Sequence, residues 1–281
     1  MFKMDIIKKG LINLKCDKMW LENNRIPFFK KIKFLFDKYL SIGLNQRHIN
    51  YLGKNFNYDN RFSPVILQNY PKEVEDLDKT VNLSKVKTIL DIGANIGQWS
   101  FTIKSFFPHV KIYSFEPNDK IFSMLSSNRS SFDKNKWVIL PYAVSSKDGE
   151  KKFYFSKSAS PEGSFYKENM SQNYVRADVQ ETRVKTISLT KKNLQKLKIP
   201  HTVDLVKIDV EGAEMEALQG LKNTSFKYLE IEVVRNREVG VSVEQVKKYF
   251  EKKGIKVKLL HTDFFNKDSP AGNAIFEIIN K

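Results

Sequence analysis

The sequence contains very little cysteine and histidine, and this excludes several kinds of site. Cys16 is the only cysteine in 281 residues, so no internal disulfide and no cysteine-based zinc or iron–sulfur site can form. The four histidines lie too far apart for a local ligand pair such as His-x-x-x-His. A reduced, cytoplasmic setting fits this composition best.

Long apolar segments are also absent. No stretch of about 18 residues is free of polar side chains, as a membrane span requires. Lys8 and Lys9 interrupt the start of the chain, where an export signal has its apolar core, so we expect neither a span nor an export signal. With 41% hydrophobic residues, 12 Gly and 9 Pro, the composition excludes general disorder and collagen-like repeats and indicates a globular chain.

Positive charge, in contrast, is in excess. The 48 Lys and Arg against 32 Asp and Glu give a formal net charge of +16, which suits an acidic partner such as nucleic acid, anionic lipid or a phosphorylated substrate. The excess is densest at the start of the chain, since residues 1–50 hold 11 basic and 4 acidic side chains. Charge alone does not choose among these partners.

A basic amphipathic helix is predicted over Pro27–Leu40, with lysines between its apolar positions. The apolar residues at helical spacing are Phe28, Ile32, Leu35, Phe36 and Tyr39. Two interpretations are open: this stripe packs against the rest of the protein, or it contacts an anionic membrane surface or a lipid-linked acceptor. We assign residues 1–84 to a basic helical extension or cap and residues 85–281 to an α/β domain.

Beyond about Lys85, short β-branched runs alternate with helical ones, which is typical of a parallel sheet with helices on both faces. The seven predicted strands are Lys87–Ile92, Lys111–Phe115, Trp137–Tyr142, Leu205–Val210, Tyr228–Val234, Ile255–Leu260 and Ala274–Ile279. No helical pattern separates the last two, so we expect the last strand to be antiparallel at one edge. Two further alternating runs, Lys151–Phe155 and Thr182–Ser188, flank the polar loop Ser156–Gln180, and such long loops often contact substrates.

The most informative stretch runs from Thr88 to Trp99 and reads as a strand, a turn of small residues and a helix start. Gly93 and Gly97 allow a tight turn and the close approach of a nucleotide-like ligand. Asn95 stands where a dinucleotide-binding turn has its second glycine, and Asp91 ends the strand beneath the turn. A carboxylate there repels a pyrophosphate but suits the cationic ammonium of a methionyl group. S-adenosylmethionine therefore fits better than NAD.

A second acidic residue ends the next strand. Glu116 lies 19 residues after Gly97, and at about that distance a carboxylate can accept both hydroxyls of an adenosine ribose. Plain packing explains a lone glycine turn, but it does not explain the combination of strand, turn, helix and spaced acid. The third strand ends in Tyr142-Ala143-Val144, whose small residues flank either an adenine or ordinary packing.

Lys207 and Asp209 place charges in a strand that should lie inside the sheet. Alternation puts both on one face, although a central parallel strand is normally apolar on both faces. Leaving either charge buried without a partner would cost several kcal/mol. They form either a structural ion pair or the polar end of a ligand crevice, where Asp209 can act as a general base or an anchor.

Three glutamates follow this strand. Glu211 and Glu214 are predicted on the first turn of the next helix, near its positive end, and Gly212 between them indicates a close approach. Helix-dipole stabilisation alone would explain one of the two. Glu232 is nearest the carboxyl end of the following strand, where a solvated edge explains it as well as a site role does.

Together these residues resemble the FkbM-type family of S-adenosylmethionine-dependent methyltransferases. The similarity rests on Asp91–Gly97, Phe115–Asn118, Leu125–Asn128, Ala143–Ser145, Asp148–Gly149 and Val206–Glu214. It covers Lys85 to Val234 well and the C-terminal strands loosely, and residues 1–84 fall outside it. The run Lys-Ile-Asp-Val-Glu-Gly-Ala-Glu is specific to that family, whereas the glycine turn is shared with many methyltransferases.

The resemblance implies a Rossmann-like class I methyltransferase sheet and O-methylation of a hydroxyl on a sugar, glycan or related small molecule. By position, the methionyl part would lie against Asp91, Gly93, Asn95 and Gly97. The ribose would lie against Glu116 and the adenine near Ala143, and Asn118 would also bind the cofactor. The acceptor site would be lined by Lys207, Asp209 and Glu211.

The expected mechanism is in-line displacement, in which an acceptor oxygen attacks the sulfonium methyl while a carboxylate takes its proton. Asp209 is the first candidate for this base, and Glu211 and Glu232 are alternatives. Clustered carboxylates could instead bind a divalent cation that orients a diol.

Three rival functions are open. The net charge invites an RNA or DNA methyltransferase, but the place of the usual Asn/Asp-Pro-Pro-aromatic run reads Asp209-Val210-Glu211-Gly212, and acid repels phosphate. A nicotinamide-dependent oxidoreductase is disfavoured by Asn95. It is also disfavoured because this chain is not expected to supply the Tyr-x-x-x-Lys catalytic pair of such enzymes. A non-catalytic module that kept only the fold is the third. We expect a small-molecule, glycan or glycolipid acceptor and a cytoplasmic protein, with membrane association through Pro27–Leu40 as the open alternative.

Overall fold

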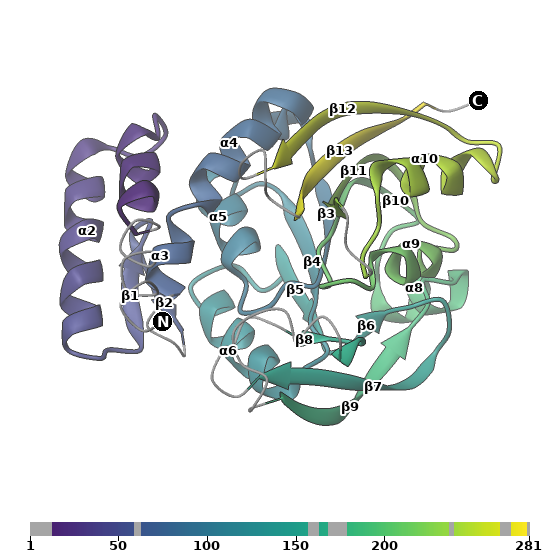
Figure 1. The fold of residues 1–281 in the computed structure, drawn as a ribbon, viewed down its shortest axis with the longest axis horizontal. Helices are drawn as coiled ribbons and strands as arrows, with labels where there is room; N and C mark the ends of the chain where they lie inside the picture. Colours follow the sequence, from purple (N-terminus) through teal and green to yellow (C-terminus); the bar gives the residue numbers. More distant parts are fainter. Residues whose placement is uncertain are drawn as a thin grey trace.

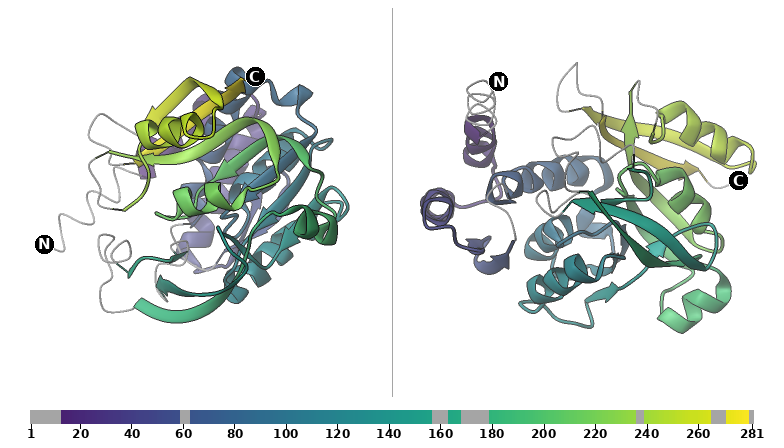
Figure 2. Two further views of the ribbon diagram at one scale, coloured as in Figure 1. Left: turned by 90° about the vertical axis from the view of Figure 1, so that its right-hand side faces the viewer. Right: turned by 60° about the horizontal axis from the view of Figure 1, so that its bottom comes forward.

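The computed structural model describes residues 13–58, 63–156, 163–167, 179–235, 239–264 and 271–279. Its centre is a seven-stranded sheet with helices on both faces, and a four-stranded sheet lies beside it (Figure 1). The N-terminal helices lie outside one helical layer, and helix α2 (Phe28–Gly43) forms the outer edge of the molecule (Figures 1 and 2). The predicted α/β class is confirmed.

The main sheet has the strand order β12-β13-β11-β10-β3-β4-β5. In chain order its strands are β3 (Thr88–Ile92), β4 (Lys111–Phe115), β5 (Trp137–Leu140), β10 (Thr202–Ile208), β11 (Ser225–Val234), β12 (Lys256–Phe264) and β13 (Ala271–Ile279). All pairs among β3, β4, β5, β10 and β11 are parallel. β13 is antiparallel to both β11 and β12, which confirms the expected antiparallel last strand.

The strand order reverses between β3 and β10. From β3 the chain adds β4 and then β5 on one side, whereas β10 and then β11 are added on the other side. In open α/β sheets, ligands bind outside the carboxyl ends of the strands at such a reversal. The fold therefore predicts a ligand site at the carboxyl ends of β3 and β10.

Helices cover both faces of the main sheet and bury two hydrophobic clusters against it. One layer consists of α4 (Tyr70–Val81), α5 (Gln98–Phe106) and α6 (Asp119–Arg129). The other consists of α8 (Lys191–Leu197), α9 (Glu214–Gly220) and α10 (Val243–Glu251). Local chemistry sets several helix starts: the Asn118 side chain caps α6, and Ser242 with Gln245 forms a capping box on α10.

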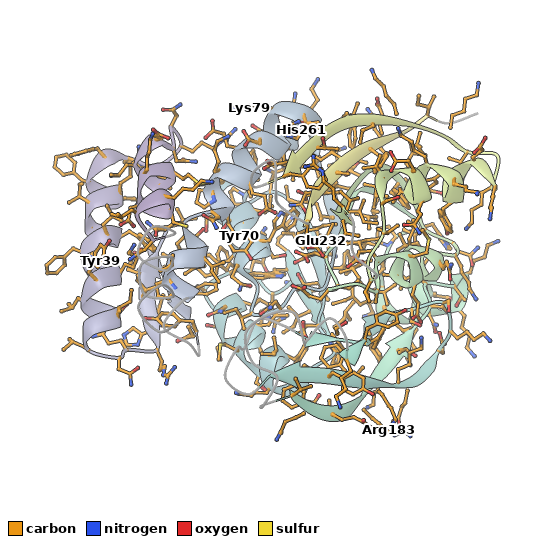
Figure 3. The ribbon with its side chains drawn as sticks, in the orientation of Figure 1. Tyr39, Tyr70, Lys79, Arg183, Glu232 and His261 are labelled. Atoms are coloured by element: carbon orange, nitrogen blue, oxygen red, sulfur yellow. The ribbon has the colours of Figure 1, made fainter. Side chains whose placement is uncertain are left out.

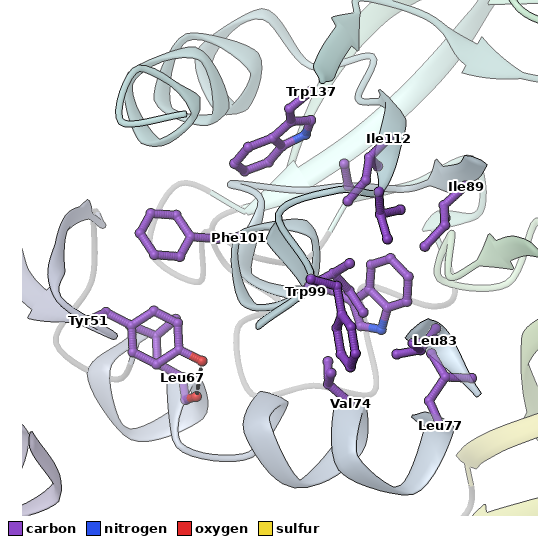
Figure 4. Packing of buried hydrophobic residues seen from close by; sticks show 14 of the residues in the cluster. Tyr51, Leu67, Val74, Leu77, Leu83, Ile89, Trp99, Phe101, Ile112 and Trp137 are labelled. Carbon is purple, nitrogen blue, oxygen red and sulfur yellow. Dashed lines mark hydrogen bonds between the residues drawn. The ribbon is translucent and has the colours of Figure 1, made fainter. Parts of the chain in front are cut away.

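The N-terminal segment shares its core with the α4–α5–α6 layer. The hairpin of β1 (His48–Tyr51) and β2 (Lys54–Asn57) and the short helix α3 (Ser63–Leu67) lie between α2 and that layer. The ring of Tyr51 lies 5.6 Å from that of Phe101, and its hydroxyl is 3.0 Å from the carbonyl oxygen of Leu67 (Figure 4). Trp20 and Phe34 are buried in the same cluster. The division at residue 85 stays a prediction.

The predicted helix Pro27–Leu40 is confirmed as α2, with Pro27 at its N-cap. The side chains that it buries are Phe34, Lys38 and Ser41. Four of the five apolar positions predicted for its stripe are exposed: Phe28, Ile32, Phe36 and Tyr39. The interpretation that the stripe packs into the protein's own core is therefore wrong for these four residues. Within the described residues, no helix is both long and apolar enough to cross a bilayer.

The two further alternating runs are confirmed as β7 (Gly149–Ser156) and β9 (Val179–Ile187), an antiparallel pair. With β6 (Ala143–Val144) and β8 (Gly163–Ser164) they form the small sheet, in the order β6-β9-β7-β8. Of the predicted loop Ser156–Gln180, residues 157–162 and 168–178 lie outside the described part of the chain.

Candidate active site

A cavity of about 300 Å³ lies at the carboxyl ends of β3, β4 and β10. Its walls come from the segments after β3, β4, β5 and β10, from the small sheet, and from α3 and α4. Nine of the eleven predicted site residues line it: Asp91, Gly93, Asn95, Glu116, Asn118, Ala143, Lys207, Asp209 and Glu211. Gly97 and Glu232 do not line it.

The turn after β3 depends on glycine at two positions for different reasons. Gly93 has φ +87°, and a Cβ atom there would lie 1.8 Å from the carbonyl oxygen of Asp209. Gly97 has φ +92°, and its Cβ would meet Leu125 of α6 at 2.7 Å. Gly93 thus lets β3 and β10 approach each other under the cavity, whereas Gly97 lets α5 begin against α6.

Asp91 is fully buried at the end of β3. Its Oδ2 atom accepts hydrogen bonds from Ser100 Oγ at 2.6 Å and Ser114 Oγ at 3.2 Å. Its Oδ1 atom is buried without a hydrogen-bond partner. Burial raises the pKa of Asp91, and the ammonium of Lys207 and the two hydroxyls oppose that rise. An acceptor atom without a partner in a cavity wall fits a ligand that donates a hydrogen bond.

Glu116 ends β4 and faces the same cavity. Its two carboxylate oxygens accept the backbone N–H groups of Asn95 at 3.1 Å and Asn118 at 2.8 Å. Burial raises the pKa of Glu116 to about 7, although these two hydrogen bonds favour the ionised form. The Oδ1 atom of Asn118 accepts from the N–H groups of Lys120 and Ile121, so this atom caps α6 while the residue lines the cavity.

One part of the cavity wall is apolar and aromatic. Ala143 lies there beside Tyr142 and Val144, and its place near an adenine stays a prediction. The small sheet adds Phe153, Phe155, Gly163 and Phe165. Ser164 joins this sheet to the turn after β10, since its Oγ donates to the Glu211 carbonyl oxygen at 2.6 Å.

Lys207 is 3% exposed, and its Nζ donates to Asp209 Oδ2 at 2.8 Å. The carboxylate of Asp209 is the more accessible partner, at 38% side-chain exposure. Burial alone would lower the pKa of Lys207, but the carboxylates of Asp209, Asp91, Glu73 and Glu230 raise it above its ordinary value. The ion pair thus lies in the wall of the cavity, and a functional role for these two charges stays a prediction.

Three charged residues stand in a row across neighbouring strands. Lys207 of β10 is in register with Asp91 of β3 on one side and with Glu230 of β11 on the other. Glu230 is 2% exposed, and burial followed by the charge of Glu73 raises its pKa well above the ordinary value. Its Oε2 atom has no hydrogen-bond partner. We call Asp91, Lys207 and Glu230 the charged row.

The prediction that Glu211 lies on the first turn of a helix is wrong. Helix α9 begins at Glu214, and Glu211 and Gly212 form a turn with φ values of +51° and +100°. Glu214 holds this turn, because its Oε1 accepts the N–H of Gly212 at 2.7 Å. Gly212 therefore serves a left-handed turn rather than a close approach along a helix.

Glu232 lies further along β11 than the charged row, in register with Asn273 of β13. It is partly exposed and labelled near the centre of Figure 3. The spacing Tyr-x-x-x-Lys does occur, at Tyr249 and Lys253, but neither residue lines the cavity. The Tyr249 hydroxyl donates to the carbonyl oxygen of Leu218 at 3.1 Å, so it has a packing role.

Sequence reasoning missed the contribution of residues 1–84 to the cavity. Ile66 of α3 and Tyr70 of α4 line it, and Tyr70 is labelled beside the sheet in Figure 3. Glu73, one turn further along α4, is close enough to Lys207 and Asp209 for their charges to act on it. Burial raises the pKa of Glu73, and Lys207 opposes this. The spacing of Tyr70 and Glu73 places both residues on one face of a helix. The sequence does not show that this face packs over the sheet, so their position at the cavity could not be predicted.

The cavity fits S-adenosylmethionine in its chemistry. Its lining holds four carboxylates, Asp91, Glu116, Asp209 and Glu211, against the ammonium groups of Lys120 and Lys207. An excess of acid attracts a cationic ligand and repels phosphate. The small residue Ala143, beside Val144 in the lining, suits the neighbourhood of a purine. Among the residues that the structure describes, no three His, Cys, Asp or Glu are grouped to hold a metal ion.

Comparison with known proteins shows the family of this chain. The model of the methyltransferase FkbM domain matches residues 91–257, more than half of the chain. The chain is 26% identical over 203 residues to methyltransferase sdnD of Sordaria araneosa, covering 63% of this chain and 76% of that protein. It is 24% identical over 186 residues to methyltransferase 1 of Beauveria bassiana (strain ARSEF 2860), covering 63% and 75%.

Among solved structures, the chain is similar to magnesium protoporphyrin IX methyltransferase of Synechocystis PCC 6803 with bound SAM. That match has a TM-score of 0.46 and 12% identity, and covers 88% of this chain and 91% of the other. TYW2 of P. horikoshii in complex with MeSAdo has a TM-score of 0.48 and 12% identity, and covers 91% and 86%.

Proposed function

The chain belongs to the FkbM methyltransferase family and is an S-adenosylmethionine-dependent methyltransferase; from this premise we propose that it methylates a hydroxyl oxygen of a sugar, glycan or related small molecule. One observation carries the proposal: the carboxylates suited to the cofactor and the ion-paired carboxylate suited to a base line the same cavity. When bound, S-adenosylmethionine supplies an electrophilic methyl group on a sulfonium, which leaves S-adenosylhomocysteine as the second product.

The cofactor end of the cavity is assigned to Asp91, Glu116 and the turn between them. Asp91 Oδ1 is free to accept a hydrogen bond from an ammonium group or from a water that bridges to one. Glu116 lies at the carboxyl end of the neighbouring strand, where its ionised form accepts ribose hydroxyls. Gly93 and Asn95 line the cavity where the methionyl part is assigned, and Ala143 lines it where the adenine is assigned.

At the acceptor end, Asp209 is the group assigned to receive the proton of the acceptor hydroxyl. The O–H bond breaks, the proton passes to the Asp209 carboxylate, and the oxygen lone pair forms the new bond to the methyl carbon. Lys207 holds this carboxylate in place through the 2.8 Å ion pair. Glu211 and Glu232 are the alternative bases; only Glu211 of these two lines the cavity.

The aromatic wall supports a sugar-like acceptor. The aromatic residues that line the cavity include Phe153, Phe155, Phe165, Tyr70 and Trp99. The C–H face of a sugar ring packs against such rings while its hydroxyls reach the carboxylates. A polyanion such as RNA lacks that apolar face and meets an acidic lining.

A thermal-shift measurement with two ligands tests the cofactor. S-adenosylhomocysteine should raise the Tm of the full chain by an amount that grows with the logarithm of its concentration above Kd, and NAD should not. A rise with NAD and none with S-adenosylhomocysteine would contradict the assignment.

A screen with a labelled methyl donor tests the acceptor class. Mono- and oligosaccharides, glycolipids and total RNA are offered to the enzyme side by side. Base-stable label on a sugar hydroxyl supports the proposal, whereas label found in RNA alone, or on a carboxyl or amine, refutes it.

The substitution Asp209→Asn tests the base. We expect turnover to fall about 10²–10⁴-fold, because the amide cannot take the proton, while S-adenosylhomocysteine still binds. Glu211→Gln and Glu232→Gln are the matched comparisons, each removing one carboxylate of an alternative base. If either of these removes turnover while Asp209→Asn keeps it, the proton goes elsewhere.

A further inference from the structure

Helix α2 carries a continuous apolar arc on its outer face. Phe29 is 86% exposed, Phe36 68% and Phe28 65%, and Ile32, Tyr39 and Leu40 are each at least 43% exposed. At 100° per residue these six positions fall within about one third of the helix circumference. We call these six residues the outer arc. Aromatic side chains gathered in one exposed patch usually mark a binding surface.

The rotation of α2 is fixed, so the outer arc cannot turn inward. Lys38 is completely buried on the opposite side, where its ammonium contacts Asp17 and donates to Gln68 Oε1 at 3.1 Å. Trp20 Nε1 donates to the carbonyl oxygen of Lys31 at 3.1 Å. The Trp20 and Phe34 rings pack 4.2 Å apart. Rotating α2 about its axis would break the polar contacts of Lys38 and the packing of Phe34 against Trp20.

Lysines lie along one flank of the outer arc. Lys30 and Lys33 are exposed there, Lys33 Nζ donates to Asp37 Oδ2 at 2.8 Å, and residues 1–50 carry 11 basic against 4 acidic side chains. A second copy docked face to face would bring two such positive segments together, and their repulsion opposes that dimer. With an anionic bilayer the electrostatic interaction is attractive instead of repulsive. The headgroups attract the lysines while the phenylalanine rings enter the membrane interface.

We propose that the outer arc of α2 docks on the surface of an anionic membrane, with Lys30 and Lys33 against lipid headgroups. The occupant is a bilayer surface, not a span, because α2 is amphipathic and its inner face is packed in the protein. Docking needs neither the cofactor nor the acceptor, so it stands or falls separately from the proposed reaction.

Vesicle co-sedimentation of the full chain tests the proposal. We expect binding to vesicles of phosphatidylcholine with about 30% phosphatidylglycerol, weak binding to pure phosphatidylcholine, and loss of binding as salt is raised. Binding that is independent of lipid charge, or no binding at low salt, would overturn it.

Two pairs of variants separate the apolar from the electrostatic part. Phe29→Ser with Phe36→Ser should weaken vesicle binding about tenfold or more, and Lys30→Glu with Lys33→Glu should do the same on anionic lipid only. The controls are Ile279→Ser, an exposed apolar residue far from α2 in the sequence, and Lys134→Glu with Lys192→Glu, which make the same charge change elsewhere. Circular dichroism confirms that every variant is folded.

The oligomeric state tests the alternative that the outer arc is an interface between two copies of this chain. Light scattering on the full chain without lipid should give a mass that Phe29→Ser with Phe36→Ser leaves unchanged. If the parent is instead a dimer that these substitutions split, the outer arc is an interface between copies and the membrane proposal is wrong. Test variants with parental vesicle binding would refute it equally.

Discussion

Lys207 determines the charge balance of the site at the scale of single residues. One ammonium group lies among the carboxylates of Asp209, Asp91, Glu73 and Glu230, and most of this cluster is buried. Buried carboxylates in excess of their cations hold protons more tightly than in water. Glu116, Glu73 and Glu214 accordingly have pKa values raised to about 7 by burial. Several groups of the site therefore change charge near neutral pH.

The raised pKa of Glu116 predicts a pH-dependent cofactor affinity. The ionised carboxylate is the better acceptor for ribose hydroxyls, so S-adenosylhomocysteine should bind more tightly as pH rises through about 7. The effect of this pKa shift on stability has the opposite sign. Glu116 binds its proton more tightly in the folded protein than in the unfolded chain. Its contribution to the free energy of unfolding is therefore fully present below about pH 4.5 and is lost as pH rises through about 7.

Calorimetric titration of S-adenosylhomocysteine between pH 5.5 and 8.5 measures this affinity. Glu116→Gln should weaken binding by about tenfold at pH 8 and flatten its pH dependence. Glu214→Gln is the control, because Glu214 also has its pKa raised to about 7 by burial but does not line the cavity. An unchanged slope in Glu116→Gln would remove Glu116 from the ribose position.

The close packing at Gly93 predicts that adding one methyl group there strongly destabilises the fold. In Gly93→Ala the new Cβ would overlap the Asp209 carbonyl oxygen and the φ of +87° would be strained. We expect the free energy of unfolding to fall by about 3 kcal/mol or more, measured by urea denaturation. Gly43→Ala is the control, since nothing lies within 4 Å of its added Cβ, and it should leave stability within about 0.5 kcal/mol of the parent. Equal stability of the two variants would contradict the close approach of β3 and β10.

At the scale of elements, α4 covers the reaction site although it precedes the matched domain. The family match begins at residue 91, whereas Ile66 and Tyr70 line the cavity and Glu73 faces the charged row. The small sheet closes another side with its phenylalanines. We therefore expect acceptor selection to depend on elements outside the strands to which the cofactor is assigned.

Tyr70→Ala tests that contribution of α4. Removing the ring opens the acceptor side, so kcat/KM for the acceptor should fall about tenfold to a hundredfold, mostly through KM, while the Kd of S-adenosylhomocysteine changes little. Tyr39→Ala removes a tyrosine from α2 in the same N-terminal segment, far from the cavity (Figure 3), and should leave both constants unchanged with a soluble acceptor. If Tyr70→Ala weakens only S-adenosylhomocysteine binding, Tyr70 belongs to the cofactor end.

The sequence was sufficient wherever the chemistry is local. Asp91, Glu116 and Asp209 were identified because each ends or follows its own apolar strand, and strand ends gather at one edge of a parallel sheet. Glu211 was misassigned because a positive φ is rare for a glutamate. Tyr70 and Glu230 were missed because their roles depend on which helix covers the sheet and on which strands become neighbours. Gly97 was read as a ligand contact, but its neighbour is Leu125 of a later helix.

At the scale of the whole molecule, the core continues from the N-terminal segment into the sheet. Tyr51 and Phe56 contact Phe101 of α5, and Asn128 of α6 donates to the carbonyl oxygen of Asn57 at 3.0 Å. Removing the hairpin would expose several aromatic rings at once. The helical extension and the catalytic sheet thus depend on each other for stability.

This shared core predicts one cooperative unfolding transition. Deletion of residues 1–58 should lower Tm by well over 10 °C or prevent soluble expression, because the deletion uncovers the Phe101 cluster. Calorimetry of the full chain should show one peak, and the peak should be raised as a whole by S-adenosylhomocysteine. A truncated protein that melts at the parental temperature would establish an independent sheet domain.

The position of β10 between β3 and β11 also sets the order in which the protein can be built. The partners in the charged row, Asp91 and Lys207, are separated in the sequence by β4, β5 and the whole small sheet. During synthesis β3 must wait with one edge unpaired until residues 202–208 emerge, and such an edge invites wrong pairing. The cavity wall therefore cannot be completed until β10 and the residues up to Ala213 that follow it have been synthesised, long after β3.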